Sequence, residues 1–245
     1  MLIPSSRYTK QDLEIWKIRE EEDIFLSQTN RLKKLEERAL NALRLFWEKG
    51  FFFVGVSWGK DSVVIAHLST RLHAENIRPK IIWFPAGNIE NPDCILVRDA
   101  FLSKYSCDYE EIITAPMGEI DELYGHDGAQ KEFERASKQA GLRYASGVRA
   151  AESGVRTKRM KRFGENSKNT CAPIGFWPTE YVFAYLYKYD LPIHPIYACS
   201  LAGFYDRNYL RVGTLGGKRG RGFGRFEYEW TYYSKEMKEL GFHHQ

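Results

Sequence analysis

Residues 51–62 read FFFVGVSWGKDS, and this stretch decides the fold of the chain. Its first six residues are a short apolar run that follows Gly50 and contains Gly55, which is typical of a strand buried on both faces of a parallel sheet. An apolar helical pattern then begins at Ser62 or Val63. Where a parallel strand turns tightly into a helix N-terminus, unpaired amide N–H groups and the positive end of the helix dipole point to the same place. The stretch therefore predicts an anion-binding loop, to which Ser57, Ser62 and Lys60 add two hydroxyl groups and a cation.

The alternation of strand and helix continues along the chain. Residues 80–84, 109–114 and 144–148 are further strand candidates, and helical patterns at 63–75 and 92–105 lie between strands. This spacing favours parallel strands joined by right-handed crossovers. We therefore predict an α/β, Rossmann-like fold in which a twisted parallel sheet is flanked by helices.

The pattern differs at the two ends of the chain. Apolar residues recur at helical spacing in 1–49, where Thr29 or Asn30 can cap a second helix. Residues 213–224 contain six glycines among basic residues, so we expect an irregular basic segment there. The sequence thus predicts an N-terminal helical segment at 1–49, a sheet domain at 50–200 and an irregular C-terminal segment at 201–245.

The formal net charge of +4 conceals an uneven distribution of charge. Residues 141–168 carry eight basic and two acidic side chains, and residues 207–225 carry six basic and no acidic ones. Each stretch has a charge of +6, so the rest of the chain carries −8. Concentrated positive charge favours partners that bear several phosphates or sulfates, although either stretch can also be a solvated basic loop.

Composition excludes several classes of protein. A hydrophobic fraction of 43% and only nine prolines exclude a disordered or collagen-like chain. No apolar run approaches the roughly 20 residues of a membrane-spanning helix, and residues 1–14 lack the pattern of a secretion signal. We expect a soluble cytoplasmic protein with no membrane partner. The four cysteines, Cys94, Cys107, Cys171 and Cys199, have no CxxC spacing, and we expect them to be reduced, buried thiols. The alternative is that the fold brings all four together as one cluster.

Two motifs resemble those of a known superfamily. SWGKDS at 57–62 resembles the SGGKDS pyrophosphate-binding loop of the PP-loop ATP pyrophosphatases, with Trp58 in place of a glycine. A Walker A loop is excluded because Gly55 and Gly59 are one residue too close. GVRAAESGVR at 147–156 resembles the G-x-R-x-x-E-S-x-x-R segment of the phosphoadenosine phosphosulfate (PAPS) reductase and ATP sulfurylase small-subunit group, as do parts of 176–197.

The resemblance implies an adenine nucleotide alpha hydrolase-like domain at 50–200 that binds ATP, or PAPS or adenylyl sulfate, together with Mg²⁺. In this interpretation Lys60 and its loop hold the β and γ phosphates, and Asp61 is the Mg²⁺ ligand. Arg149 and Arg156 would lie on one side of a helix two turns apart and hold a phosphate or sulfate, unless they are solvated loop charges. Predicted catalytic residues are Lys60, Asp61, Arg149 and Arg156, and predicted nucleotide-binding residues are Ser57, Trp58, Gly59, Lys60, Asp61, Ser62, Trp83, Phe84, Gly147 and Glu152.

Some of these assignments keep an alternative. Trp83 and Phe84 are expected beside the adenine at the carboxyl ends of the strands, or else they only pack the sheet edge. Residues 213–225, with Phe223 and Phe226, can bind a tRNA or DNA acceptor, or can form a lid over the nucleotide. A homo-oligomer or a partner subunit is compatible with the sequence.

Three functions follow as hypotheses. The first is an enzyme that binds ATP or an adenylyl-sulfate nucleotide and acts at the α-phosphorus, as an ATP pyrophosphatase or adenylyl transferase in sulfur-related or nucleic-acid modification. The second is a thiol-dependent PAPS reductase, although residues 239–245 read ELGFHHQ where reductases of the group have E-C-G-[IL]-H. The third is a non-catalytic protein that binds a nucleotide or nucleic acid.

Overall fold

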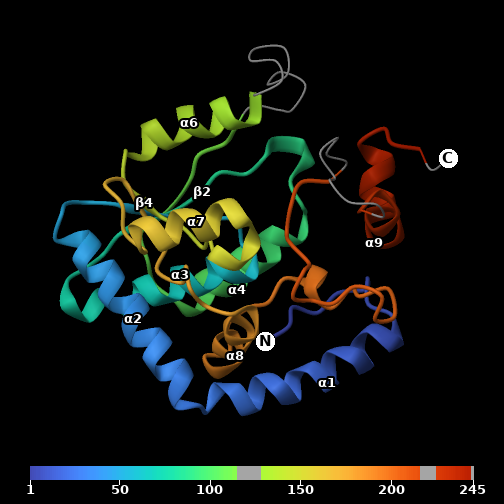
Figure 1. Cartoon of the computed structure of the whole chain (residues 1–245). Helices are drawn as coiled ribbons and strands as arrows, with labels where there is room; N and C mark the ends of the chain where they lie inside the picture. The colour runs from blue at the N-terminus through green and yellow to red at the C-terminus, as the bar shows by residue number, and fades with distance from the viewer. Residues whose placement is uncertain (115–127, 216–224, 244–245) are drawn as a thin grey trace.

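The computed structural model describes residues 1–114, 128–215 and 225–243 (Figure 1).

The centre of the protein is a five-stranded parallel sheet. The strand order is β3-β2-β1-β4-β5, and every described pairing is parallel. This sheet confirms the predicted fold class. The strands are β1 (Phe53–Val56), β2 (Lys80–Trp83), β3 (Tyr109–Glu111), β4 (Tyr144–Ala145) and β5 (Thr170–Cys171).

Several strands are shorter than predicted. β3 ends at Glu111 rather than 114, and β4 ends at Ala145 rather than 148. Beyond β4 the chain turns toward the neighbouring loop, because Gly147 lies against Asp61. Strand β5 is not predictable from the sequence, because its two residues are too few to show a period.

The crossover helices lie on both faces of the sheet (Figure 1). Helix α3 begins at Lys60 rather than at 62 or 63, because Gly59 has an extended backbone and serves as the N-cap. It ends at Thr70, and the predicted continuation to 75 is a separate 3-10 turn. The other helices of this region are α4 (Asp93–Lys104), α6 (Gly128–Ala140), α7 (Gly154–Phe163) and α8 (Thr179–Lys188), with α3 spanning Lys60–Thr70.

The N-terminal segment forms two helices, as predicted. These are α1 (Lys10–Ser27) and α2 (Asn30–Trp47), and the hydroxyl of the N-cap Thr29 accepts a hydrogen bond from the amide of Leu32. Helix α1 packs along α8 (Figure 1), where Trp16 meets Phe183 edge to face.

The expectation of an irregular C-terminal segment is wrong for its last part. Residues Arg225–Glu239 form helix α9, which has a kink at Tyr233. Its buried residues Tyr228, Tyr232 and Met237 recur at helical spacing, a signal that the glycine-rich stretch before them concealed. Arg7 anchors the helix by bonding to the Glu236 carboxylate and the Tyr232 carbonyl.

Part of the predicted basic segment lies outside the described residues. These are Lys218, Arg219, Arg221 and Phe223, together with the side chains of Arg225 and Phe226. The lid and nucleic-acid roles expected for 213–225 therefore stay predictions, as do the domain boundaries. Residues from 1–49, 50–200 and 201–245 contribute to one large hydrophobic core. No helix in the described ranges has the length and apolar character needed to cross a membrane.

The two faces of β1 pack differently. Val54 and Val56 face the large core, whereas Phe53 faces a small cluster formed with α6. On this second face the next inward position is Gly55, which adds no side chain and is only partly buried. The sheet therefore leaves room beside Gly55 for a pocket.

Candidate nucleotide-binding site

The loop after β1 is held by its own side chains. Ser62 donates its hydroxyl to the carbonyl of Gly59 at 2.9 Å and accepts the amide of Ser57 at 3.2 Å. The Lys60 amide donates to the Tyr197 hydroxyl at 3.0 Å. Among the described residues, the amides of Asp61 and Ser62 have no acceptor. Because they begin helix α3, these two N–H groups make the helix N-terminus a site for an anion.

Trp58 points away from this site. Its φ of 56° lies in the left-handed region, which a glycine adopts freely and which costs a tryptophan roughly 1–2 kcal/mol. The indole is fully buried and packs against Phe101 and Tyr109, with ring centroids 5.7 and 5.8 Å away. Burial of a large side chain contributes on the order of 3 kcal/mol, which offsets the strain. The prediction that Trp58 binds the nucleotide is therefore not supported, whereas Ser57, Gly59, Lys60, Asp61 and Ser62 line a pocket.

Asp61 lies between two buried cations. Its Oδ1 accepts a hydrogen bond from Arg149 Nε at 2.6 Å, and its Oδ2 is 3.0 Å from Lys60 Nζ. Arg149 also donates to the Thr179 hydroxyl at 2.9 Å and to the Trp177 carbonyl at 3.3 Å. Burial lowers the pKa of Lys60, while the charge of Asp61 acts in the opposite direction. The network fixes both cations beside the N-terminus of α3.

Arg149 and Arg156 are not on one helix, contrary to the prediction. Arg149 has an extended backbone and precedes a 3-10 turn at Ala150–Glu152, whereas Arg156 is in the first turn of α7. Arg149 is only 2% exposed, which excludes a solvated loop charge. Arg156 forms an ion pair with Glu152, and both line the pocket.

Gly147 brings β4 into contact with the loop. A Cβ atom at this position would lie 2.8 Å from the Asp61 carbonyl carbon and 2.9 Å from its Cβ, closer than real Cβ atoms approach other atoms. Gly147 also lines the pocket. A glycine is thus required here by close packing.

The pocket has a volume of about 350 Å³, within the range of small-molecule sites. Four aromatic rings line one part of it and contact one another: Phe53 stacks on Tyr144 at 5.6 Å, and Phe84 meets Phe53 and Phe133 edge to face at 5.8 and 5.5 Å. Polar and cationic groups from the loop, α7 and residue 211 line the other part. The pocket is therefore aromatic at one side and positively charged at the other.

Trp83 does not line this pocket. It is 3% exposed and belongs to the large core on the other face of the sheet, where the Arg98 guanidinium lies 5.8 Å from its ring. Trp83 thus packs in the core of the sheet, as in the second alternative, and Phe84 is the member of the pair that lines the pocket.

The structure adds residues that the sequence analysis missed. Arg211 and Val212 line the pocket, and Val212 lies 3.4 Å from where a Cβ on Gly59 would be. Burial, and after it the charges of Arg211 and Arg149, lower the pKa of Arg156, so the three guanidinium groups share one region. Phe53, Phe133 and Tyr144 come from β1, α6 and β4. Only the concentration of arginine in 207–225 pointed toward Arg211.

The donor set does not fit a magnesium ion at Asp61. Both carboxylate oxygens already contact cations, and Glu152 is paired with Arg156. In the described part of the chain, no three His, Cys, Asp or Glu side chains come together as a metal site. Asp61 is therefore not assigned as a Mg²⁺ ligand, and the reaction below has no step that depends on one.

The cysteines are dispersed and poorly reactive. Cys107 precedes β3 and Cys171 is in β5, at opposite edges of the sheet, so the four cannot form one cluster. Burial raises the pKa of Cys107 to about 11 and also raises the pKa values of Cys94, Cys171 and Cys199. Because thiolate is the nucleophilic form, these thiols are poor nucleophiles.

Comparisons with known proteins bear on the family and the fold of the chain. A family model described as the phosphoadenosine phosphosulfate reductase domain matches residues 52–216, which is more than half of the chain. Among solved structures, the chain is similar to the U34-tRNA thiolase NcsA from Methanococcus maripaludis, solved with its 4Fe–4S cluster. The TM-score is 0.50 at 16% sequence identity, and the match covers 86% of this chain and 80% of that chain. This likeness concerns the fold alone. A search of curated proteins finds no matching sequence.

Proposed function

The chain belongs to the phosphoadenosine phosphosulfate reductase domain family, and from that premise we propose that it is an enzyme that binds ATP or an adenylyl-sulfate nucleotide and acts at the α-phosphorus. The observation that carries this proposal is the two-sided pocket. An adenine nucleotide is itself two-sided, with a flat apolar base and a chain of negative charge.

The phosphates fit the cationic side. Three cations line it, namely Lys60, Arg156 and Arg211, with the carboxylates of Asp61 and Glu152. The predicted catalytic residue Arg149 does not line the pocket and lies behind it, paired with Asp61. The free amides of the α3 N-terminus add neutral donors with fixed direction. Because Asp61, itself held by Arg149, fixes Lys60, this cation needs little reorganisation when an anion binds.

The base fits the aromatic side. Phe84, Phe133 and Tyr144 offer ring faces and edges for stacking on adenine. Gly55 leaves the sheet surface open between the two sides, since an added Cβ would meet only Phe53 and the Ala145 carbonyl at 3.7 and 3.8 Å.

The reaction that suits this arrangement is displacement at the α-phosphorus. An acceptor nucleophile forms a bond to the α-phosphorus of ATP, the bond from that phosphorus to the bridging oxygen breaks, and pyrophosphate leaves with the electron pair. Negative charge then grows on the pyrophosphate, and preorganised cations such as Lys60 stabilise it.

The acceptor is proposed to be a nucleic acid that undergoes sulfur-related modification in the cytoplasm. The first basic stretch borders the pocket through Arg156, and the structural neighbour is a tRNA thiolase. A PAPS reduction through cysteine has less support, since the four thiols have raised pKa values and none of them lines the pocket.

Pyrophosphate release from ATP tests the proposal. We expect Lys60→Ala to lower turnover roughly 100- to 1,000-fold, as does removal of a comparable preorganised donor in other enzymes. Lys33→Ala is the matched control, because Lys33 is exposed on α2. Because Lys60 is buried, the thermal unfolding of each variant must be measured beside the assay. Arg211→Ala is a second pocket variant, and it does not disturb the core because Arg211 is exposed. Full turnover in both pocket variants would contradict the proposal, and nucleotide binding without pyrophosphate release would favour a non-catalytic protein.

A further inference from the structure

Helix α7 carries more positive charge than the pocket needs. Its ten residues, GVRTKRMKRF, contain five cations and no acid. Only Arg156 lines the pocket and pairs with a carboxylate. Lys158, Arg159, Lys161 and Arg162 are exposed and, among the described residues, have no acidic partner.

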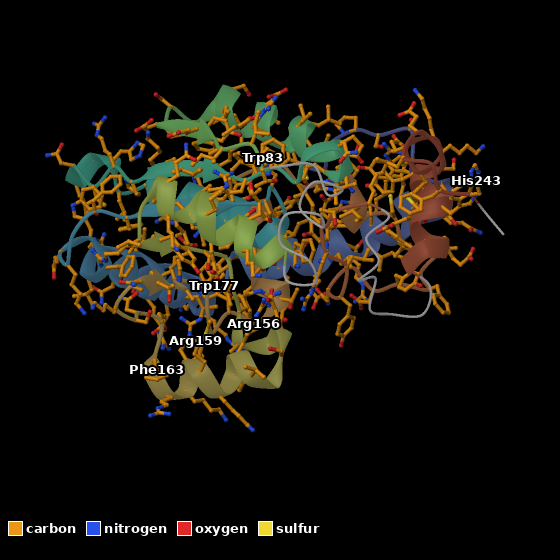
Figure 2. The ribbon with its side chains drawn as sticks, turned by 90° about the horizontal axis from the view of Figure 1, so that it is seen from above. Trp83, Arg156, Arg159, Phe163, Trp177 and His243 are labelled. Carbon is orange, nitrogen blue, oxygen red and sulfur yellow. The ribbon has the colours of Figure 1, made fainter. Side chains whose placement is uncertain are left out.

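The helix buries little of its own surface, although Thr157 donates a hydrogen bond to the Ala150 carbonyl and Arg159 donates one to the Thr170 hydroxyl, both at 2.7 Å. Met160 is its only buried residue, and its sulfur packs against Gly175. Figure 2 shows α7 standing out from the rest of the ribbon, with Arg156, Arg159 and Phe163 along its length. These four cations have no carboxylate to neutralise them, and those spaced three or four residues apart repel one another, so an anion bound along the helix would be favoured.

Exposed apolar side chains accompany the cations. Phe163 is 55% exposed, and the guanidinium of Arg162 lies 5.1 Å from its ring. Val155 is 79% exposed, but the cations Lys158, Arg159 and Arg162 lie between it and Phe163 on the helix surface, so the two residues do not form a continuous apolar face. A face of this kind does not suit insertion into a lipid bilayer, which needs one apolar side. An exposed ring beside cations does suit a polynucleotide with unpaired bases, whose phosphates contact the cations while a base stacks on the ring.

We propose that α7 is a binding surface for single-stranded nucleic acid. Lys158, Arg159, Lys161 and Arg162 contact the phosphodiester backbone, and Phe163 stacks on an unpaired base. Seven residues of helix separate Phe163 from Arg156 at the pocket, a distance of about 10 Å. A strand on α7 therefore lies within reach of the nucleotide. That this strand is the acceptor rests on the proposed function, whereas the binding surface itself does not.

Fluorescence anisotropy with labelled single-stranded RNA and DNA of equal length and sequence tests the surface. For four phosphate contacts on a single strand, the affinity should fall roughly 50-fold between 50 and 200 mM salt, and only about 7-fold for Lys158→Glu/Arg162→Glu, which retains two contacts. Phe163→Ala should weaken binding roughly tenfold. The control is Lys33→Glu/Lys34→Glu, two exposed lysines on α2 with the same change in charge.

The outcomes separate this surface from the proposed activity. Weaker binding in the α7 variants, with control binding and basal pyrophosphate release unchanged, supports the proposal, and the RNA and DNA arms then show which strand is preferred. Equal loss in the α7 and α2 variants would overturn it, as would binding that survives Lys158→Glu/Arg162→Glu. Anionic phosphatidylglycerol vesicles form a further arm, and an α7-dependent affinity for vesicles but not for oligonucleotides would also overturn it. If Lys60→Ala and wild type both fail to release pyrophosphate while α7 still binds strands, the proposed function fails and the surface stands.

Discussion

Gly147→Ala tests the contact that joins β4 to the anion-binding loop. The new methyl group would lie 2.8 Å from the Asp61 carbonyl carbon, 2.9 Å from its Cβ and 3.0 Å from its carbonyl oxygen. The first and last of these atoms are backbone in the first turn of α3, so no flexible side chain can move aside. Either β4 or the α3 N-terminus must shift by several tenths of an ångström.

The expected cost is that of overpacking, about 1–3 kcal/mol. For a chain of 245 residues this corresponds to a Tm lower by roughly 2–12 °C. The shift also moves Asp61 relative to Arg149, whose Nε lies 2.6 Å from Oδ1, so ATP affinity should fall together with stability. Calorimetric melting and titration with ATP measure the two effects.

Gly154→Ala is the matched control, because a Cβ there would meet no atom within 4 Å. Gly154 begins α7, so the alanine should be neutral or raise Tm slightly. Should Gly147→Ala melt and bind ATP like Gly154→Ala, the required close approach of β4 and α3 would be refuted.

Three further predictions concern single side chains. His67 and His194 are buried, which lowers the pKa of each to about 3, so both remain neutral when folded while the unfolded chain gains protons below about pH 6.5. The free energy of unfolding should therefore fall as pH drops, by about 1.4 kcal/mol per pH unit for each histidine. Urea unfolding of His67→Gln between pH 6 and 4.5 should show a pH dependence that is shallower by this amount. An unchanged slope would contradict a neutral His67 in the folded protein. Tyr197→Phe removes the acceptor of the Lys60 amide and should cost about 1 kcal/mol in urea unfolding, and no change in stability would show that this bond is unimportant. Arg211→Ala should weaken ATP binding about tenfold or more with an unchanged Tm, because its side chain is exposed, and equal affinity in calorimetric titration would remove Arg211 from the site.

Local sequence predicted the parts of the site that depend on neighbours along the chain. The apolar run at 51–56, the small residues after it and the helix that follows are contiguous, so their pattern determines both the strand and the loop. The family resemblance added Gly147, Arg149, Glu152 and Arg156, and each of these contacts the loop or lines the pocket.

The remaining features arise from distant contacts. The aromatic side combines rings from β1, α6 and β4, and Arg211 comes from a segment beyond the predicted domain. The sequence predicted a helix that contains Arg149. Arg149 instead precedes a 3-10 turn at Ala150–Glu152, which is too short to be recognised from a periodic pattern. Trp58 could not be oriented from sequence, because the side of the loop that its ring occupies depends on Phe101 and Tyr109.

The binding of a nucleotide at the N-terminus of α3 is the central claim, and a thermal-shift comparison tests it most directly. ATP, adenylyl sulfate and PAPS are each added to wild type and to Lys60→Ala. At a concentration 100 times its Kd, a ligand stabilises the native state by about 2.7 kcal/mol, which raises Tm by roughly 5–10 °C for a chain of this size. We predict such a rise for at least one of the three nucleotides in wild type, and a much smaller rise in Lys60→Ala. No rise with any of them, or an equal rise in both proteins, would contradict the account.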